Sequence, residues 1–135
     1  GMGGVPSAVF KFRTMTAGDN PMIPDASRIT RVGALLRRLS LDELPQLINV
    51  WRAEMSIVGP RPTLAYQVER YDHVQRARLG VRPGLTGLAQ VSGRNSLPWA
   101  ERIRLDVEYV QRQSMRFDIE LIARTFVPLL TGQGV

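Results

Sequence analysis

Residues 28–62 read RITRVGALLRRLSLDELPQLINVWRAEMSIVGPRP. Val32, Leu35, Leu36 and Leu39 recur at helical spacing, with arginines off this apolar stripe, so an amphipathic helix is predicted over about 30–39. A second helix is predicted over about 42–54. The prolines of GPRP, residues 59–62, predict a rigid turn. The stretch therefore predicts two helices that lead into a constrained turn.

The start of the second helix is open to two interpretations. In SLDELPQ, residues 40–46, Ser40 and Glu43 fit a capping box, but Pro45 would then lie past the first turn and remove a hydrogen bond. If Asp42 is the N-cap, Pro45 lies inside the first turn, where its missing N–H matters less. Both interpretations place Asp42 at a helix N-terminus.

The segments on either side complete the predicted fold. Residues 9–15, VFKFRTM, alternate apolar and polar side chains, which predicts a strand with a basic face, and residues 16–27 predict a loop. Thr63 is expected to cap a third helix to about 79, with Leu64, Val68, Tyr71 and Val74 inward. Turn, strand and turn are predicted over 81–95, and helices over about 98–112 and 118–130. The predicted fold class is α+β: a mostly helical single domain with amphipathic helices and a few short strands.

Length and composition limit the class of protein. The 135 residues are 44% hydrophobic, which suits one domain with a packed core. The formal net charge of +6 favours anionic partners: nucleic acid, phosphorylated metabolites or an acidic membrane surface. The absence of cysteine excludes disulfides and thiolate metal sites, and a single histidine argues against zinc. No apolar run approaches the roughly 20 residues that span a bilayer.

Asp42 and Glu43 form an adjacent acidic pair beside a run of arginines. One interpretation is that they only complement the dipole of the helix they begin. The other is chemical, because a carboxylate at this position can attack phosphorus or bind Mg²⁺. Glu43 could then help to hold the metal or handle a proton.

Two arginines lie in turns that restrict their motion. Arg61 stands between two prolines, and Arg94 stands between Gly93 and Asn95. An arginine held in this way is positioned to bind a phosphate with both arms of its guanidinium. The alternative is that both side chains only make the surface polar.

Asp106 is the acid least expected from its surroundings. It shares a helical face with Trp99, Ile103 and Val110. An acid within an apolar stripe needs a partner or a function. A buried salt bridge to an arginine and a functional carboxylate are both open at this point.

Four segments of the chain share a recognisable pattern: KFRTM at 11–15, the 28–62 stretch, RPGLTGLAQVSGRN at 82–95 and LDVEYV at 105–110. Together they resemble the bacterial sugar transferase family, the monotopic phosphoglycosyl transferases that begin glycan assembly on a lipid carrier. The similarity runs from about residue 9 to the C-terminus.

The resemblance implies a reaction and a pathway class. A sugar phosphate passes from a UDP-sugar to polyprenyl (undecaprenyl) phosphate, giving polyprenyl diphosphate sugar and UMP. The route implied is a covalent aspartyl phosphosugar intermediate, with Mg²⁺ as the cofactor. The products would initiate exopolysaccharide, O-antigen or other glycoconjugate synthesis.

The resemblance also implies roles for individual residues. Asp42 matches the nucleophile and Glu43 its partner, and both would bind the metal. Asp106 matches an acid near the nucleotide. Ala53 stands where the family usually has glycine, and we expect no consequence. The basic residues implied to bind the substrate phosphates are Lys11, Arg13, Arg37, Arg61 and Arg94.

Members of the family carry a hydrophobic membrane helix before the KFRTM motif, whereas eight residues precede the predicted strand here. We interpret residues 1–8, which begin Gly-Met-Gly-Gly, as a cloning scar and truncated N-terminus, and residues 9–135 as the catalytic domain. We expect the full-length protein at the cytoplasmic face of the bacterial inner membrane. This fragment would be soluble or peripherally bound to an anionic membrane surface, and it is a candidate homo-oligomer.

Two other functions are alternatives. A basic nucleic-acid-binding module would explain the charge, but the sequence shows no pattern of recognition helix or stacking aromatics, so no nucleic acid is expected. An inactive membrane-surface scaffold is the other alternative. The nucleic-acid-binding module leaves the acidic residues at 42, 43 and 106 unexplained. The intact Asp42, Glu43 and Arg61 argue against the inactive scaffold.

Overall fold

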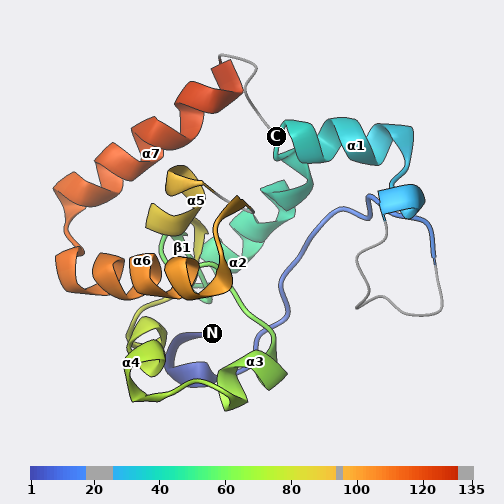
Figure 1. Cartoon of the computed structure of the whole chain (residues 1–135). Helices are drawn as coiled ribbons and strands as arrows, with labels where there is room; N and C mark the ends of the chain where they lie inside the picture. Colours follow the sequence, from blue (N-terminus) through green and yellow to red (C-terminus); the bar gives the residue numbers. More distant parts are fainter. Residues whose placement is uncertain (18–25, 94–95, 131–135) are drawn as a thin grey trace.

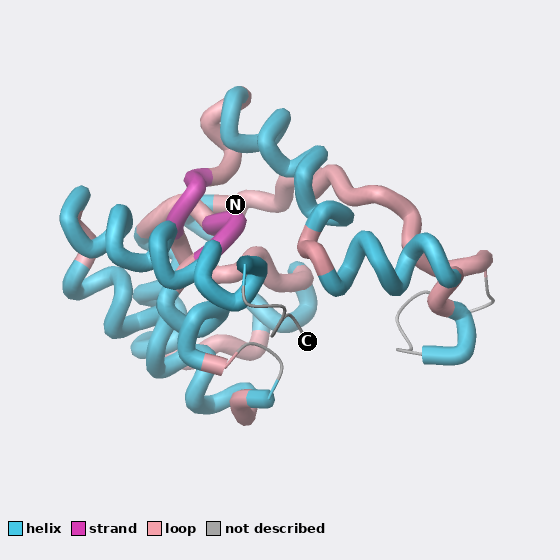
Figure 2. The backbone as a smooth tube through the Cα atoms, turned by 90° about the horizontal axis from the view of Figure 1, so that it is seen from above, coloured by secondary structure: helices cyan, strands magenta, loops and turns pink. Residues whose placement is uncertain are grey.

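Two short parallel strands, β1 (Ser56–Val58) and β2 (Gly84–Thr86), lie among the helices of the computed structural model (Figure 2). The structure describes residues 1–17, 26–93 and 96–130. Ser56 pairs with Gly84, and Val58 pairs with Thr86. Helices make up most of the rest, so the predicted α+β class is confirmed.

The helices, with 3-10 helices labelled η, have these bounds: η1 Met2–Gly4, η2 Ala26–Arg28, α1 Arg31–Arg38, η3 Leu41–Gln46, α2 Leu47–Trp51, α3 Ala65–Glu69, α4 His73–Arg76, η4 Ala77–Gly80, α5 Leu88–Ser92, α6 Trp99–Arg112 and α7 Met115–Leu130. In Figure 1, α5 lies between α6 and α7, while α1 extends on the opposite side of the molecule. The site described below forms between these two parts.

The main core joins β1 to α5, α6 and α7. Tyr109 of α6 stacks on Phe117 of α7 with ring centroids 6.0 Å apart, and its hydroxyl donates to Asp118 Oδ1 at 2.8 Å. Burying such side chains supplies most of the free energy that holds the layers together. The buried cluster comprises Val58, Leu88, Ala89, Leu105, Tyr109, Phe117 and Leu121.

Two glycines let backbone segments pack directly against each other. A Cβ at Gly84 would lie 2.1 Å from the backbone nitrogen of Gly59, across the strand pair. A Cβ at Gly33 of α1 would lie 2.0 Å from the carbonyl oxygen of Thr14. Any side chain at these positions would have to displace backbone.

The strand predicted over 9–15 is wrong. In the described ranges, this segment makes one isolated antiparallel bridge, between Met15 and Ile29, and no named strand. The alternating pattern correctly indicates extended backbone, but a side chain takes the place of a partner strand.

That side chain is Asn49 of α2, which is fully buried. Its Oδ1 accepts from the N–H of Phe10 at 3.1 Å, and its Nδ2 donates to the carbonyl of Ala8 at 2.7 Å. Nδ2 also donates to Glu54 Oε2 at 2.6 Å. One amide therefore satisfies backbone groups that a sheet would otherwise pair.

The first and fourth predicted helices are confirmed as α1 and α6. Thr30 caps α1, since its hydroxyl accepts from the N–H of Gly33 at 2.9 Å. The predicted last helix is confirmed as α7, but it begins at Met115, three residues earlier than expected. These helices have strong periodic patterns, which explains the agreement.

The second predicted helix begins differently from both interpretations. Residues Leu41–Gln46, including Pro45, form the 3-10 helix η3, and α2 follows. Ser40 precedes η3 with φ 55° and makes no side-chain cap, so the capping box and the Asp42 N-cap are both wrong. Asp42 does lie in the first turn, as predicted.

The third predicted helix is broken into α3, α4 and η4. Asp72 starts α4 by accepting from the N–H of Gln75 at 2.8 Å, and Leu64 rather than Thr63 precedes α3. Tyr71 is buried as expected, but Leu64 and Val74 are exposed. The predicted helix is interrupted at Asp72, because its side chain bonds the backbone N–H of Gln75 and so begins a new helix.

The remaining predictions are confirmed in part. The strand expected within 81–95 is β2, but the short helix α5 after it was not predicted. Much of the loop predicted over 16–27 lies outside the described residues. Ala53 has φ 58°, a conformation that glycine adopts more easily, so the expectation that alanine has no consequence there is wrong.

We predict that Asn49→Ala destabilises the protein by about 2–3 kcal/mol, because buried backbone groups at Ala8 and Phe10 lose their partner. Urea unfolding followed by circular dichroism measures this change. Gln111→Ala, at an exposed position of α6, is the control and should change stability little. Equal effects of the two substitutions would contradict the anchoring role of Asn49.

Candidate active site

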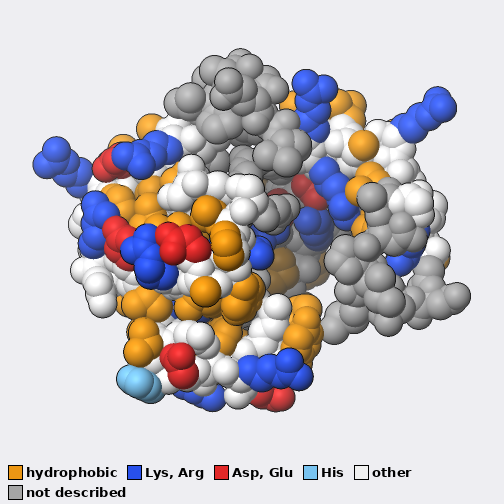
Figure 3. Space-filling view, in the orientation of Figure 1, with side chains coloured by type: hydrophobic (Ala, Val, Ile, Leu, Met, Phe, Trp, Pro, Cys, Tyr) orange, Lys and Arg blue, Asp and Glu red, His pale blue; other side chains and the backbone are white. Residues whose placement is uncertain are grey.

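A cavity of about 590 Å³ lies between the part of the molecule that carries α1 and the part that carries α6 and α7. Figure 3 shows acidic and basic side chains together in the recess there. Its size suits a small-molecule ligand. Its polar lining comes from many elements and includes Lys11, Arg37, Asp42, Glu43, Arg61, Gln67, Arg78, Gln90, Arg102 and Asp106.

The predicted acidic pair lies in this cavity and is held by two cations. Lys11 Nζ lies 2.9 Å from Asp42 Oδ2 and 3.4 Å from Glu43 Oε1. Arg61 Nη2 lies 2.7 Å from Glu43 Oε1. Asp42 is only 3% exposed, so its charge is shielded from water but not from Lys11. The four charged groups form one connected cluster.

The cations keep Glu43 ionised. Burial alone would raise the pKa of this carboxyl. The charges and hydrogen bonds of Arg61 and Lys11 together outweigh burial and lower the pKa below its ordinary value. Glu43 is therefore a poor proton donor near neutral pH in this state.

The local backbone places these side chains. The left-handed conformation of Ser40 ends α1 and leads into η3, whose first turn carries both acids. The N–H of Phe12 donates to the carbonyl of Asp42 at 2.9 Å, which fixes the neighbouring Lys11 beside the carboxylates. Arg61 reaches Glu43 from the turn after β1.

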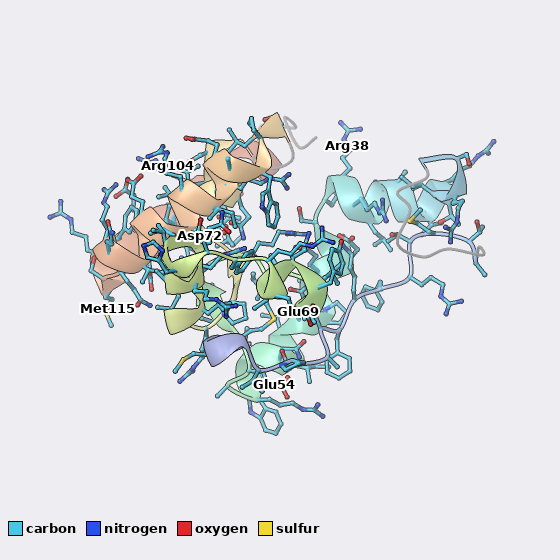
Figure 4. All side chains as sticks on the ribbon, turned by 60° about the horizontal axis from the view of Figure 1, so that its bottom comes forward. Arg38, Glu54, Glu69, Asp72, Arg104 and Met115 are labelled. Carbon is cyan, nitrogen blue, oxygen red and sulfur yellow. The ribbon has the colours of Figure 1, made fainter. Side chains whose placement is uncertain are left out.

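The other basic residues predicted to bind phosphate differ in where they lie relative to the cavity. Arg37 lines the cavity, and its Nε donates to Thr14 Oγ1 at 2.8 Å. Its neighbour Arg38 extends away from α1 (Figure 4). Arg13 is exposed and is not among the residues that line the cavity. Arg94 lies outside the described residues, so its role stays a prediction.

Asp106 joins the same cavity and is buried, with 2% exposed. Its Oδ2 pairs with Arg78 Nη2 at 2.5 Å, so the salt-bridge interpretation is confirmed. Burial raises its pKa to about 6, although the charges of Arg78 and Arg102 act in the opposite direction. The functional interpretation also stays open, because the other carboxylate oxygen lacks a hydrogen-bond partner.

The sequence did not indicate three other cavity residues with buried polar groups: Arg78, Gln90 and Arg102. Arg78 is buried, and within the described residues the Nε of Arg102 and both amide atoms of Gln90 are buried without a partner. Buried polar groups normally have partners, so a ligand or water is expected beside them. The sequence around these three residues resembles an ordinary helix surface. The sequence feature that could have indicated them is Asp106, because an acid in the apolar face of α6 requires a buried polar partner.

The donor set suits a metal ion that is shared with a substrate. No group of three or more His, Cys, Asp and Glu in the described ranges could hold a metal by itself. Mg²⁺ commonly binds one or two carboxylates together with substrate phosphates. Asp42 and Glu43 offer such carboxylates and fit this mode of binding.

Comparison with known proteins decides the family. The model of the family described as bacterial sugar transferase matches residues 1–132. The chain belongs to this family. The resemblance found in the motifs is confirmed.

Individual relatives agree with this family. The chain is 41% identical over 138 residues to the uncharacterized sugar transferase EpsL of Bacillus subtilis, with 100% of this chain and 68% of EpsL covered. It is 44% identical over 144 residues to the UDP-glucose:undecaprenyl-phosphate glucose-1-phosphate transferase of Caulobacter vibrioides, covering 97% and 54%. It is 44% identical over 129 residues to the exopolysaccharide production protein ExoY of Sinorhizobium fredii, covering 96% and 55%. The chain thus spans between about half and two thirds of the length of these curated relatives.

We predict that Asp106 makes the stability of this protein depend on pH. Its folded pKa of about 6 lies above the ordinary value of 3.8, so folding favours the protonated carboxyl. That stabilisation is complete below about pH 4 and is lost as the pH rises through about 6, by up to about 3 kcal/mol. Unfolding free energies of the parent and Asp106→Asn between these pH values measure it. A difference between the two proteins that stays constant with pH would contradict the prediction.

Proposed function

We propose that the protein transfers a sugar 1-phosphate from a UDP-sugar to undecaprenyl phosphate, at the start of exopolysaccharide or related glycoconjugate synthesis. The observation that carries the proposal is the adjacent pair Asp42 and Glu43, held by Lys11 and Arg61 inside a cavity of substrate size. The names of relatives support the donor and the acceptor, since one is a UDP-glucose:undecaprenyl-phosphate glucose-1-phosphate transferase.

The proposed chemistry has two displacements at one phosphorus. A carboxylate oxygen of Asp42 attacks the β-phosphorus of the UDP-sugar and forms an oxygen–phosphorus bond. The bond from this phosphorus to the bridging oxygen breaks, and UMP leaves with its electron pair. A phosphate oxygen of undecaprenyl phosphate then attacks the same phosphorus, and the Asp42 carboxylate leaves. Each step forms one bond and breaks one.

The cations of the site would reduce the repulsion between the attacking carboxylate and the diphosphate. A carboxylate that approaches a diphosphate meets like charge, so the phosphates must first be neutralised. Lys11, Arg61 and Arg37 line the cavity and would supply positive charge there. Arg13 and Arg94 stay predicted phosphate ligands. The free oxygen of Asp106 would accept a hydrogen bond from the nucleoside part of the donor.

We propose Mg²⁺ as the cofactor, bound by the carboxylates of Asp42 and Glu43 together with the donor phosphates. When bound, it would neutralise charge on the diphosphate. Glu43 suits this role because its low pKa keeps it ionised.

The proposal includes a membrane surface, because the acceptor is a lipid. None of the helices that the structure describes has the length and hydropathy of a membrane-spanning segment. Exposed apolar side chains follow one another along α1, η3 and α2, and Trp51 is 86% exposed. Such side chains beside basic residues suit a headgroup layer. We propose the cytoplasmic face of the inner membrane, and a homo-oligomer stays a prediction.

Asp42→Asn should abolish a covalent intermediate. The protein mixed with a UDP-sugar and Mg²⁺, without lipid acceptor, should gain the mass of one sugar phosphate, as intact-protein mass spectrometry detects. The neutral amide is a poor nucleophile, so the variant should gain nothing. Glu101→Gln, on the exposed side of α6, is the control and should form the adduct.

An adduct that still forms in Asp42→Asn would assign the nucleophile to another residue. Peptide mapping of the parent adduct then identifies the modified side chain. Modification at any residue except Asp42 contradicts the proposed chemistry.

We expect the chain to bind anionic vesicles weakly. Its formal net charge is +6, and each basic side chain near an anionic surface contributes about 1 kcal/mol. Co-sedimentation with vesicles that contain phosphatidylglycerol should fall as salt rises past physiological strength, while phosphatidylcholine vesicles bind little. Equal binding to both vesicle types would contradict the electrostatic part of the proposal.

A further inference from the structure

Arg78 is a buried cation that the proposed chemistry does not use. It lies in η4 and is 4% exposed. Its guanidinium makes three polar contacts: to the hydroxyl of Tyr71 at 2.6 Å, to the backbone carbonyl of Arg61 at 2.8 Å and to Asp106 Oδ2 at 2.5 Å. A planar fork can satisfy several acceptors in fixed directions, which a lysine cannot do.

These contacts hold both ends of the short segment 61–63, which lines the cavity. Arg78 bonds the carbonyl of Arg61 directly. At the other end, Tyr71 donates its hydroxyl to Thr63 Oγ1 at 3.0 Å while it accepts from Arg78. The third contact, to Asp106, ties the whole arrangement to α6. The segment is therefore held at both ends, directly at Arg61 and through Tyr71 at Thr63.

The side chain of Arg61 extends from this segment to Glu43, with Nη2 and Oε1 2.7 Å apart. The side chain of Arg61 is about half exposed, so little packing restrains it apart from its pair with Glu43. Its position depends on the backbone to which it is attached. Hydrogen bonds to a backbone carbonyl of this kind set the direction in which a side chain leaves the chain.

We infer that Arg78 is a positioning residue, which fixes segment 61–63 so that Arg61 meets Glu43 and the donor phosphates. The inference rests on the proposed function of the site. A merely structural salt bridge to Asp106 would require one contact, whereas a second contact goes to the Arg61 carbonyl and a third reaches Thr63 through the Tyr71 hydroxyl. Arg78 acts through Arg61, so its effect should depend on the presence of the Arg61 guanidinium.

A double-mutant cycle on turnover of a UDP-sugar with undecaprenyl phosphate tests this dependence. Arg78→Lys keeps the charge beside Asp106 and should lower kcat/KM at least about tenfold, because small misplacement of a phosphate ligand is costly. In an Arg61→Lys background the same change should cost less than about threefold. Arg104→Lys, on the outer side of α6 (Figure 4), is the matched control and should leave turnover unchanged. Losses that simply multiply in the double variant would overturn the inference.

Tyr71→Phe is the second variant, in case Arg78→Lys does not fold. It removes only the hydroxyl that links Arg78 to Thr63, and its loss of turnover should also shrink in the Arg61→Lys background. A loss that is the same in both backgrounds would overturn the inference.

A spectroscopic measurement separates this inference from the proposed function. The ¹⁵N relaxation of the Arg61 Nε–H should indicate an ordered side chain in the parent and a mobile one in Arg78→Lys or Tyr71→Phe. If the parent turns over no UDP-sugar, the proposed function fails, and this signal alone decides the inference. Equal order of Arg61 in parent and variants would overturn it.

Discussion

The pairing of two adjacent carboxylates with two cations is the constraint on which the rest of this structure depends. Asp42 is almost fully buried and Glu43 mostly so, and each would be costly to bury without a positive partner. The partners, Lys11 and Arg61, come from segments that are remote from the acids in the sequence. The fold must therefore bring an N-terminal extended segment and the turn after β1 to the same helix start.

Two separate sets of hydrogen bonds position Lys11 and Arg61 beside the acids. Asn49 and the carbonyl of Asp42 fix the extended N-terminal segment, which places Lys11. The contacts of Arg78 fix the turn that carries Arg61. In both cases, a buried polar side chain bonds a backbone group near the charged residue, which sets the direction of that residue's side chain. This pattern suits a site whose cations must meet a diphosphate in one geometry.

Several parts of this arrangement could be predicted from the sequence and others could not. The periodic helices α1, α6 and α7 and the acidic pair follow from local patterns. The segment over 9–15 resembles a strand, because the sequence cannot reveal that the amide of Asn49 replaces a partner strand. Pro45 gives a 3-10 helix instead of either predicted cap. Arg78 stands among other arginines of similar appearance, and only its three-dimensional contacts distinguish it.

Isotope exchange tests most directly whether Asp42 attacks the donor before any acceptor is present. Labelled UMP is incubated with the protein and an unlabelled UDP-sugar in the absence of undecaprenyl phosphate. A reversible first displacement predicts that label enters the UDP-sugar, and that Asp42→Asn loses this exchange. Full turnover with lipid but no exchange without it would indicate direct transfer between the substrates and would rule out a covalent intermediate on Asp42.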